Sequence, residues 1–95
     1  MVIRILDLVS SCDTNDQGDV VKQAILDSLK SSDVVSVDFF GVTNVASSFV
    51  NSSFVSLLSD FDFGTLKSRI RIQRVNRQIG NMIKDRMASE SHIPA

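Results

Sequence analysis

Apolar and polar residues recur with two different periods along this chain, and the changes of period divide it into six segments. Three short segments have a mostly apolar or strictly alternating pattern, as strands do, namely residues 2–9, 34–40 and 69–73. Three longer segments space their apolar residues three and four apart, as amphipathic helices do, namely residues 18–31, 47–59 and 76–88. Polar or glycine-containing stretches separate these segments.

The order of the segments is strand, helix, strand, helix, strand, helix. Strands that alternate with helices predict an α/β fold with a mostly parallel sheet and right-handed crossovers. The first helix has a candidate N-cap in Asp16 or Asp19, and the last has one in Asn76. We expect one small domain over residues 1–90, followed by a disordered tail at 91–95.

The composition is that of a small globular protein. Apolar residues make up 43% of the 95 residues and charged residues 22%, which is too apolar for a disordered chain. Cys12 is the single cysteine, so no intrachain disulfide can form, and this favours a reducing compartment. Arg4 and Asp7 interrupt the apolar start, which argues against a signal peptide or a membrane span. We therefore expect a cytoplasmic protein.

Charge is distributed unevenly. Residues 1–66 hold three basic and nine acidic residues, a net charge of −6, whereas residues 67–95 hold seven and two, a net charge of +5. The densest basic stretch makes Arg69, Arg71 and Arg74 candidates for binding an anion. The same arginines could instead shield an exposed strand face or complement the acidic part of the domain. No aromatic residue is interleaved with them, so nucleic-acid binding is not favoured.

Few residues have the grouping that catalysis or metal binding requires. His92 is the only histidine and lies in the tail, so no nucleophile has a base with an orienting partner. Cys12 has no basic neighbour that would lower the pKa of its thiol. Asp13, Asp16 and Asp19 lack the ligand order of a calcium loop, and the four glycines are isolated. We expect no enzymatic activity, no metal and no cofactor.

Two adjacent serines, Ser47 and Ser48, stand where the second strand gives way to a helix. A serine oxygen at this position can accept a hydrogen bond from a first-turn amide, and the same position also tolerates a phosphate. We expect Ser47 to cap the helix and Ser48 to lie in its first turn, with at least one hydroxyl exposed. The adjoining residues are then the predicted partner-docking surface, namely Val45, Phe49 and Ser52.

Asp38 ends the second strand shortly before Gly41. A carboxylate at the end of a buried strand is costly unless it is hydrogen-bonded. We therefore expect Asp38 to have a structural role, in which it accepts backbone hydrogen bonds in the turn that leads through Gly41.

The stretch from Asp38 to Phe49 resembles the signature of STAS domains. Asp38-Phe39-Phe40-Gly41-Val42 is followed by Val45-Ala46-Ser47-Ser48-Phe49, and the later IRIQ-x-VN stretch fits the same pattern. The chain most resembles the STAS-like family of unknown function found in bacteria and their mobile elements, from Asp19 to about Ala88. The resemblance implies a STAS-like fold. It also makes Ser47, with Ser48 beside it, the counterpart of the serine that is phosphorylated in anti-sigma-factor antagonists.

Two classes of function follow from this resemblance. In the first, the chain is a regulatory module that binds a protein, such as a GHKL-type ATPase or kinase, through the helix that begins near Ser47, with or without phosphorylation. In the second, it is an accessory or inhibitor protein of a phage or mobile element that binds a host complex or touches nucleic acid. Neither class requires catalysis by the chain or a membrane.

Overall fold

The sheet has three parallel strands in the order β1-β2-β3. The structure is a computed structural model that describes residues 1–91. The strands are β1 (Val2–Arg4), β2 (Val35–Asp38) and β3 (Ile70–Gln73). The helices are α1 (Ile5–Leu8), α2 (Asn15–Ser31), α3 (Ser47–Ser53), the 3₁₀ helix η1 (Val55–Ser59), α4 (Phe63–Arg69) and α5 (Arg77–Ser91). The predicted α/β class and the parallel sheet are confirmed.

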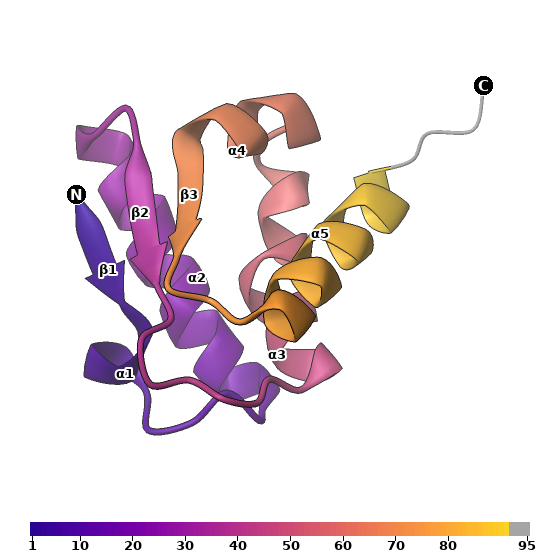
Figure 1. The fold of residues 1–95 in the computed structure, drawn as a ribbon. Coiled ribbons are helices and arrows are strands. Elements are labelled where there is room, and N and C mark those ends of the chain that lie inside the picture. Colours follow the sequence, from indigo (N-terminus) through magenta and orange to yellow (C-terminus); the bar gives the residue numbers. More distant parts are fainter. Residues whose placement is uncertain (92–95) are drawn as a thin grey trace.

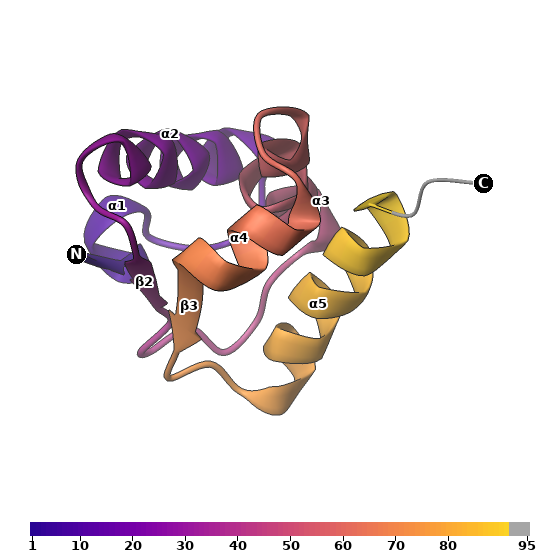
Figure 2. The same cartoon turned by 90° about the horizontal axis from the view of Figure 1, so that it is seen from above.

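Helices cover one face of the sheet and leave the other open. Figures 1 and 2 show α2, α3 and α4 on the same side of the three strands, with α5 beside β3. On the covered face the central register row is apolar and consists of Ile3, Val37 and Ile72. The open face alternates with it, as the pleat of a strand requires, and its outer strands present Arg4 and Arg71. The core therefore lies between the covered face and the helices.

β1 is shorter than the sequence predicts. We expected a strand over residues 2–9, but pairing ends at Arg4, which lies opposite the last residue of β2. Because the ladder offers no partner beyond that point, the chain turns into the one-turn helix α1, where the Val9 amide donates to the Ile5 carbonyl at 3.1 Å. Ile5 is fully buried while Leu6 and Leu8 are exposed.

α2 begins at Asn15, before the predicted start, and neither Asp16 nor Asp19 caps it. The N-cap is Thr14, whose hydroxyl accepts from the Gln17 amide, while the Gln17 side chain accepts from the Thr14 amide. This reciprocal pair is a capping box, which satisfies two amides at once and so displaces the aspartates. Asp16 lies in the first turn of α2, where a carboxylate also favours the helix N-terminus.

Gly18 lies inside α2 at its contact with α3. A Cβ at this position would come within 2.8 Å of the Phe49 carbonyl oxygen and closer still to the Ser52 hydroxyl, below any ordinary contact distance. The missing side chain therefore sets the close spacing of the two helices.

The segment at 60–69, which we expected to be a loop entering a strand, contains the helix α4. Asp62 is its N-cap and accepts from the Thr65 amide at 2.6 Å. The second predicted helix is divided at Phe54 into α3 and η1. The Asn76 cap of α5 is confirmed, because its side-chain oxygen accepts from the Ile79 amide at 2.8 Å.

The predicted tail at 91–95 is only partly covered by the structure. Ser91 is the last residue of α5. The expectation of disorder at 92–95, and the position of His92, lie outside the described residues.

Candidate functional site

The ends of the three parallel strands and the starts of α2, α3 and α5 meet at one side of the domain, which we name the carboxyl edge. It forms the lower rim of the molecule in Figure 1. Two hydrogen bonds tie its loops together: the Ala46 amide donates to the Cys12 carbonyl at 2.9 Å, and the Asn76 side chain donates to the Thr43 carbonyl at 3.3 Å. In parallel α/β sheets, binding sites are commonly built at this edge.

Asp38 is the buried acid of the carboxyl edge. It lies on the open face of the sheet, yet only 2% of its side chain is exposed. Its carboxylate accepts from the Phe40 amide at 2.9 Å and from the guanidinium of Arg74 through two nitrogens, with Arg4 at 3.8 Å. The hydrogen bond from Arg74, followed by that from Phe40, holds the pKa of Asp38 below its usual value of 3.8 despite burial. The expected backbone hydrogen bond to Asp38 is present, and Arg74 is a further partner that the sequence did not reveal.

Arg74 adopts an unusual backbone conformation to reach Asp38. Its φ is 51°, in the left-handed region that residues other than glycine seldom occupy. The guanidinium also lies over the ring of Phe40, 4.7 Å from its centre. Phe40 is nonetheless 58% exposed, so the carboxyl edge presents an aromatic ring held in place by an arginine.

The structure separates the two serines. α3 begins at Ser47 with Ala46 as its N-cap, and no side-chain oxygen caps it, so the predicted cap at Ser47 is wrong. Ser47 is exposed and its side chain has no hydrogen-bond partner among residues 1–91. Ser48 is half-buried in the first turn, as expected, and its hydroxyl donates to the Asp13 carbonyl at 3.3 Å. Of the two serines, only Ser47 has a hydroxyl without a hydrogen-bond partner in the described residues 1–91.

The predicted docking surface does not form. Phe49 is fully buried in the core and Val45 is nearly so. Ser52 is half-buried, and its hydroxyl donates to the Ser48 carbonyl at 2.8 Å. The error arose because α3 lies between α2 and α5, so the residues that follow Ser47 face other helices. The exposed residues around Ser47 belong instead to the preceding loop, where Thr43 and Asn44 are exposed.

The three arginines proposed for anion binding have different surroundings. Arg69 ends α4 rather than lying on a strand, and it donates to the carbonyls of Leu29, Ser32 and Asp33 at the end of α2. Arg74 is paired with Asp38. Arg71 is exposed on β3 and forms no ion pair within residues 1–91. Two of the three are therefore engaged inside the domain, and only Arg71 remains available to an outside anion.

Cys12 is a core residue. Its side chain is buried, and burial, with a contribution from Asp13, raises the pKa of its thiol to about 11. The thiol is therefore protonated at neutral pH and is a poor nucleophile.

The described part of the chain contains neither a candidate metal site nor a candidate membrane span. Residues 1–91 contain no cluster of three or more histidine, cysteine or acidic side chains that could hold a metal ion. None of their helices has both the length and the apolar character needed to cross a bilayer.

The comparison with known families agrees with the fold and the motif. Residues 17–79 match the family described as a STAS-like domain of unknown function. The match covers the segment from the first turns of α2 to the first turn of α5, including Asp38 and both serines. The chain therefore belongs to this STAS-like family. No curated protein and no solved structure matches the chain.

The exposed ring of Phe40 could have been found in the sequence. Phe39 and Phe40 are adjacent at the end of β2, and side chains alternate along a strand, so only one of them can face the core. Phe39 is fully buried and stacks on Phe54 at 6.0 Å, which leaves Phe40 outside. The pairing of Asp38 with Arg74 had no such signal, because 36 residues separate them.

Proposed function

We propose that this chain is a regulatory protein-binding domain whose partner contacts the loop from Phe40 to Ser47 at the carboxyl edge, and that phosphorylation of Ser47 controls the contact. The observation that carries the proposal is the exposure of Ser47. It is the first residue of α3, its side chain has no hydrogen-bond partner within residues 1–91, and it follows a loop with an exposed aromatic ring. A partner and a kinase both need such a side chain to be accessible.

Ser47 suits phosphorylation better than Ser48. Transfer of the γ-phosphoryl group of ATP to the Ser47 oxygen disrupts no hydrogen bond within residues 1–91, whereas the Ser48 hydroxyl would first have to give up its hydrogen bond to the Asp13 carbonyl. The hydroxyl proton passes to a base of the kinase, and ADP is the leaving group. The phosphate adds roughly −1.5 to −2 charges at neutral pH. Because Asp13 and Asp16 near the start of α2 are also exposed, the added charge would make this part of the edge strongly acidic.

The proposed partner follows from the family resemblance. In anti-sigma-factor antagonists the corresponding serine is phosphorylated by a GHKL-type kinase that is itself the binding partner, and phosphorylation separates the two proteins. We propose the same kind of partner here. Membership of a STAS-like family supports this class of partner, and the exposed loop supports the place of contact.

A binding experiment with three variants tests the proposal. The tagged protein is used to isolate its partner from the native host, and the affinity of the purified pair is then measured by calorimetry. Ser47→Asp should weaken binding, Ser47→Ala should bind as the wild type does, and Phe40→Ser should weaken binding through loss of the ring. Ser68→Asp, on the exposed surface of α4, is the matched control for added charge. Equal affinities for Ser47→Asp and Ser68→Asp would overturn the proposal.

A further inference from the structure

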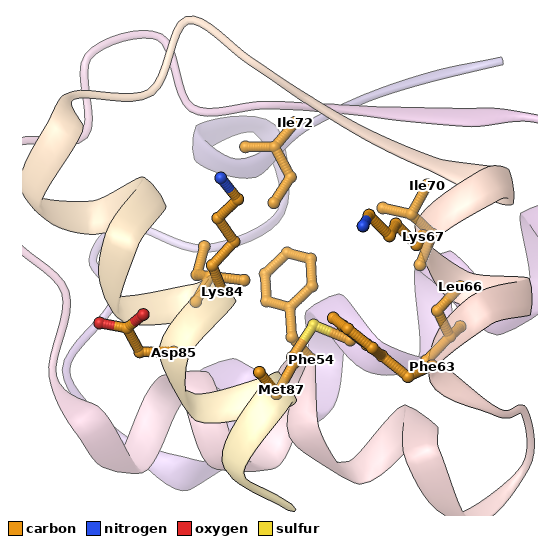
Figure 3. Close-up of a pocket in the computed structure, with 11 residues that line it drawn as sticks. Phe54, Phe63, Leu66, Lys67, Ile70, Ile72, Lys84, Asp85 and Met87 are labelled. Atoms are coloured by element: carbon orange, nitrogen blue, oxygen red, sulfur yellow. The ribbon is translucent and has the colours of Figure 1, made fainter. Parts of the chain in front are cut away.

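A groove of about 410 Å³ opens between β3, α4 and α5, away from the carboxyl edge. Its lining is mainly apolar and includes Ile83. Ile70 and Ile72 lie on one side and Met87 on the other, with Phe54 as the floor (Figure 3). It exists because α5 packs on α3 and η1 and diverges from β3. Ile70 and Ile72 are consequently only half-buried, although they belong to the covered face.

The groove runs along an unpaired edge of the sheet. β3 is the last strand in the order, so within residues 1–91 its outer side pairs with no other strand. The Phe39 amide donates to the Gln73 carbonyl, so Gln73 directs its backbone groups toward β2. Because backbone groups alternate in direction along a strand, Ile72 directs its amide and carbonyl outward. Such groups form the template on which another extended chain can pair.

Basic side chains surround this edge. Lys67 on α4 and Lys84 on α5 stand on opposite sides of the groove in Figure 3, and both are exposed. Neither forms an ion pair within residues 1–91, and the same is true of Arg71, which projects from β3 on the open face. Among the described residues that line the groove, Asp85 is the single acidic one. The charge therefore favours an acidic occupant and opposes pairing of two copies of this edge, which would bring arginines and lysines together.

We propose that a short extended segment of a partner protein, with apolar residues at alternate positions and acidic residues between and beside them, binds here as a fourth strand. Its backbone pairs with Ile72, and its apolar side chains enter the groove over Phe54. Its acidic side chains meet Arg71 on the open face and the two lysines at the rim. This surface is separate from the loop around Ser47, so the inference goes beyond the function proposed above and does not depend on it.

The test uses the full chain and a synthetic probe. The probe is an acetylated nine-residue peptide that alternates valine with glutamate, and binding is followed by calorimetry and by amide hydrogen exchange. We expect binding at peptide concentrations up to about 1 mM, and slower exchange of the Ile72 amide in the complex. A peptide with lysine in place of glutamate should not bind. A peptide with N-methyl groups on the amides that face β3 should also fail, because it cannot form the ladder.

Variants identify the surface. Lys67→Glu/Lys84→Glu should weaken binding of the acidic peptide about tenfold or more. Lys22→Glu/Lys30→Glu on α2 makes the same change in net charge elsewhere and should leave binding unchanged. The inference is overturned if the acidic peptide does not bind, if the N-methylated peptide binds equally well, or if both double variants weaken binding alike. Ser47→Asp should not alter binding of the peptide, so this test and the test of the Ser47 proposal can fail separately.

Discussion

The two faces of the sheet are stabilised in different ways. The covered face buries Ile3 and Val37 against helices, with Ile72 half-buried beside them, and adjacent Phe39 stacks on Phe54 within the same core. Within residues 1–91 no helix covers the open face, and the one buried side chain there is Asp38, held by Arg74, Arg4 and the Phe40 amide. Apolar burial involves no ionisable group and so does not change with pH, whereas the contribution of a carboxylate held by arginines depends on its ionisation. The fold should therefore respond to different perturbations on its two faces.

The largest effect is expected on the covered face. Phe39→Ala should lower the free energy of unfolding by about 3–5 kcal/mol, because it leaves a cavity beside Phe54. Urea denaturation measures the change. The adjacent Phe40→Ala is the matched control and should cost about 1 kcal/mol or less, since it removes an exposed ring and one contact with Arg74. Similar losses of stability in the two variants would contradict the assignment of Phe39 to the core and Phe40 to the surface.

The next effect concerns the open face. Asp38→Asn should lower the melting temperature by roughly 10 °C, because the buried acid is replaced and the arginines lose their counter-charge. The pKa of Asp38 is depressed in the folded state, so its contribution is present above pH 3.8 and is lost as the pH falls through the folded pKa. The stability difference between wild type and Asp38→Asn should therefore shrink below pH 3.8. Asp60→Asn, an exposed acid, should behave like the wild type, and a pH-independent difference for Asp38→Asn would contradict the ion-pair account.

A smaller effect is expected from the core at alkaline pH. Because burial raises the pKa of Cys12 from 9.0 to about 11, the unfolded chain loses the thiol proton first. The contribution of Cys12 is thus complete below pH 9 and is lost as the pH rises toward 11. The chain has no tyrosine, so no phenol group titrates in the same pH range. Thermal denaturation at pH 8 and pH 10.5 should show a smaller decline for Cys12→Ala than for the wild type.

The smallest effect is expected at Ser47. Because Ser47 is not a cap, Ser47→Ala should change the free energy of unfolding by no more than about 0.5 kcal/mol. Ser48→Ala removes the bond to the Asp13 carbonyl and should cost somewhat more, on the order of 1 kcal/mol. Chemical denaturation of both variants measures these two changes in the free energy of unfolding. A loss at Ser47 as large as that at Ser48 would show that its hydroxyl has an internal partner in solution.

The sequence was most informative where one local rule governed the outcome. The period of the apolar residues and the order of the segments were sufficient to predict the parallel sheet and the existence of α2 and α5. The residue type at the start of α5 was sufficient to predict the Asn76 cap. They were insufficient for β1, because the length of a strand depends on where its neighbour ends. The helix α4 was missed because its seven residues are too few to show a period, and its phenylalanine and glycine also suit a turn.

The candidate site was harder to predict because it depends on contacts between distant segments. Arg69 and Arg74 look alike in the sequence, but one binds the end of α2 and the other binds Asp38. Similarly, the adjacent serines differ only because the loop before α2 passes beside Ser48. The groove beside β3 depends on the angle of α5, which no local pattern encodes.

The contact at Gly18 limits how a modification of Ser47 could affect the rest of the domain. α2 and α3 touch there at backbone distance, and the Ser52 hydroxyl fills the space that a side chain would occupy. Because this close packing opposes sliding of α3 along α2, we expect the two helices to move together. A modification of Ser47 would therefore be communicated by the electric field at the surface, with the backbone unchanged. In NMR spectra, Ser47→Asp should shift the resonances of its immediate neighbours and leave those of β1 and β3 in place.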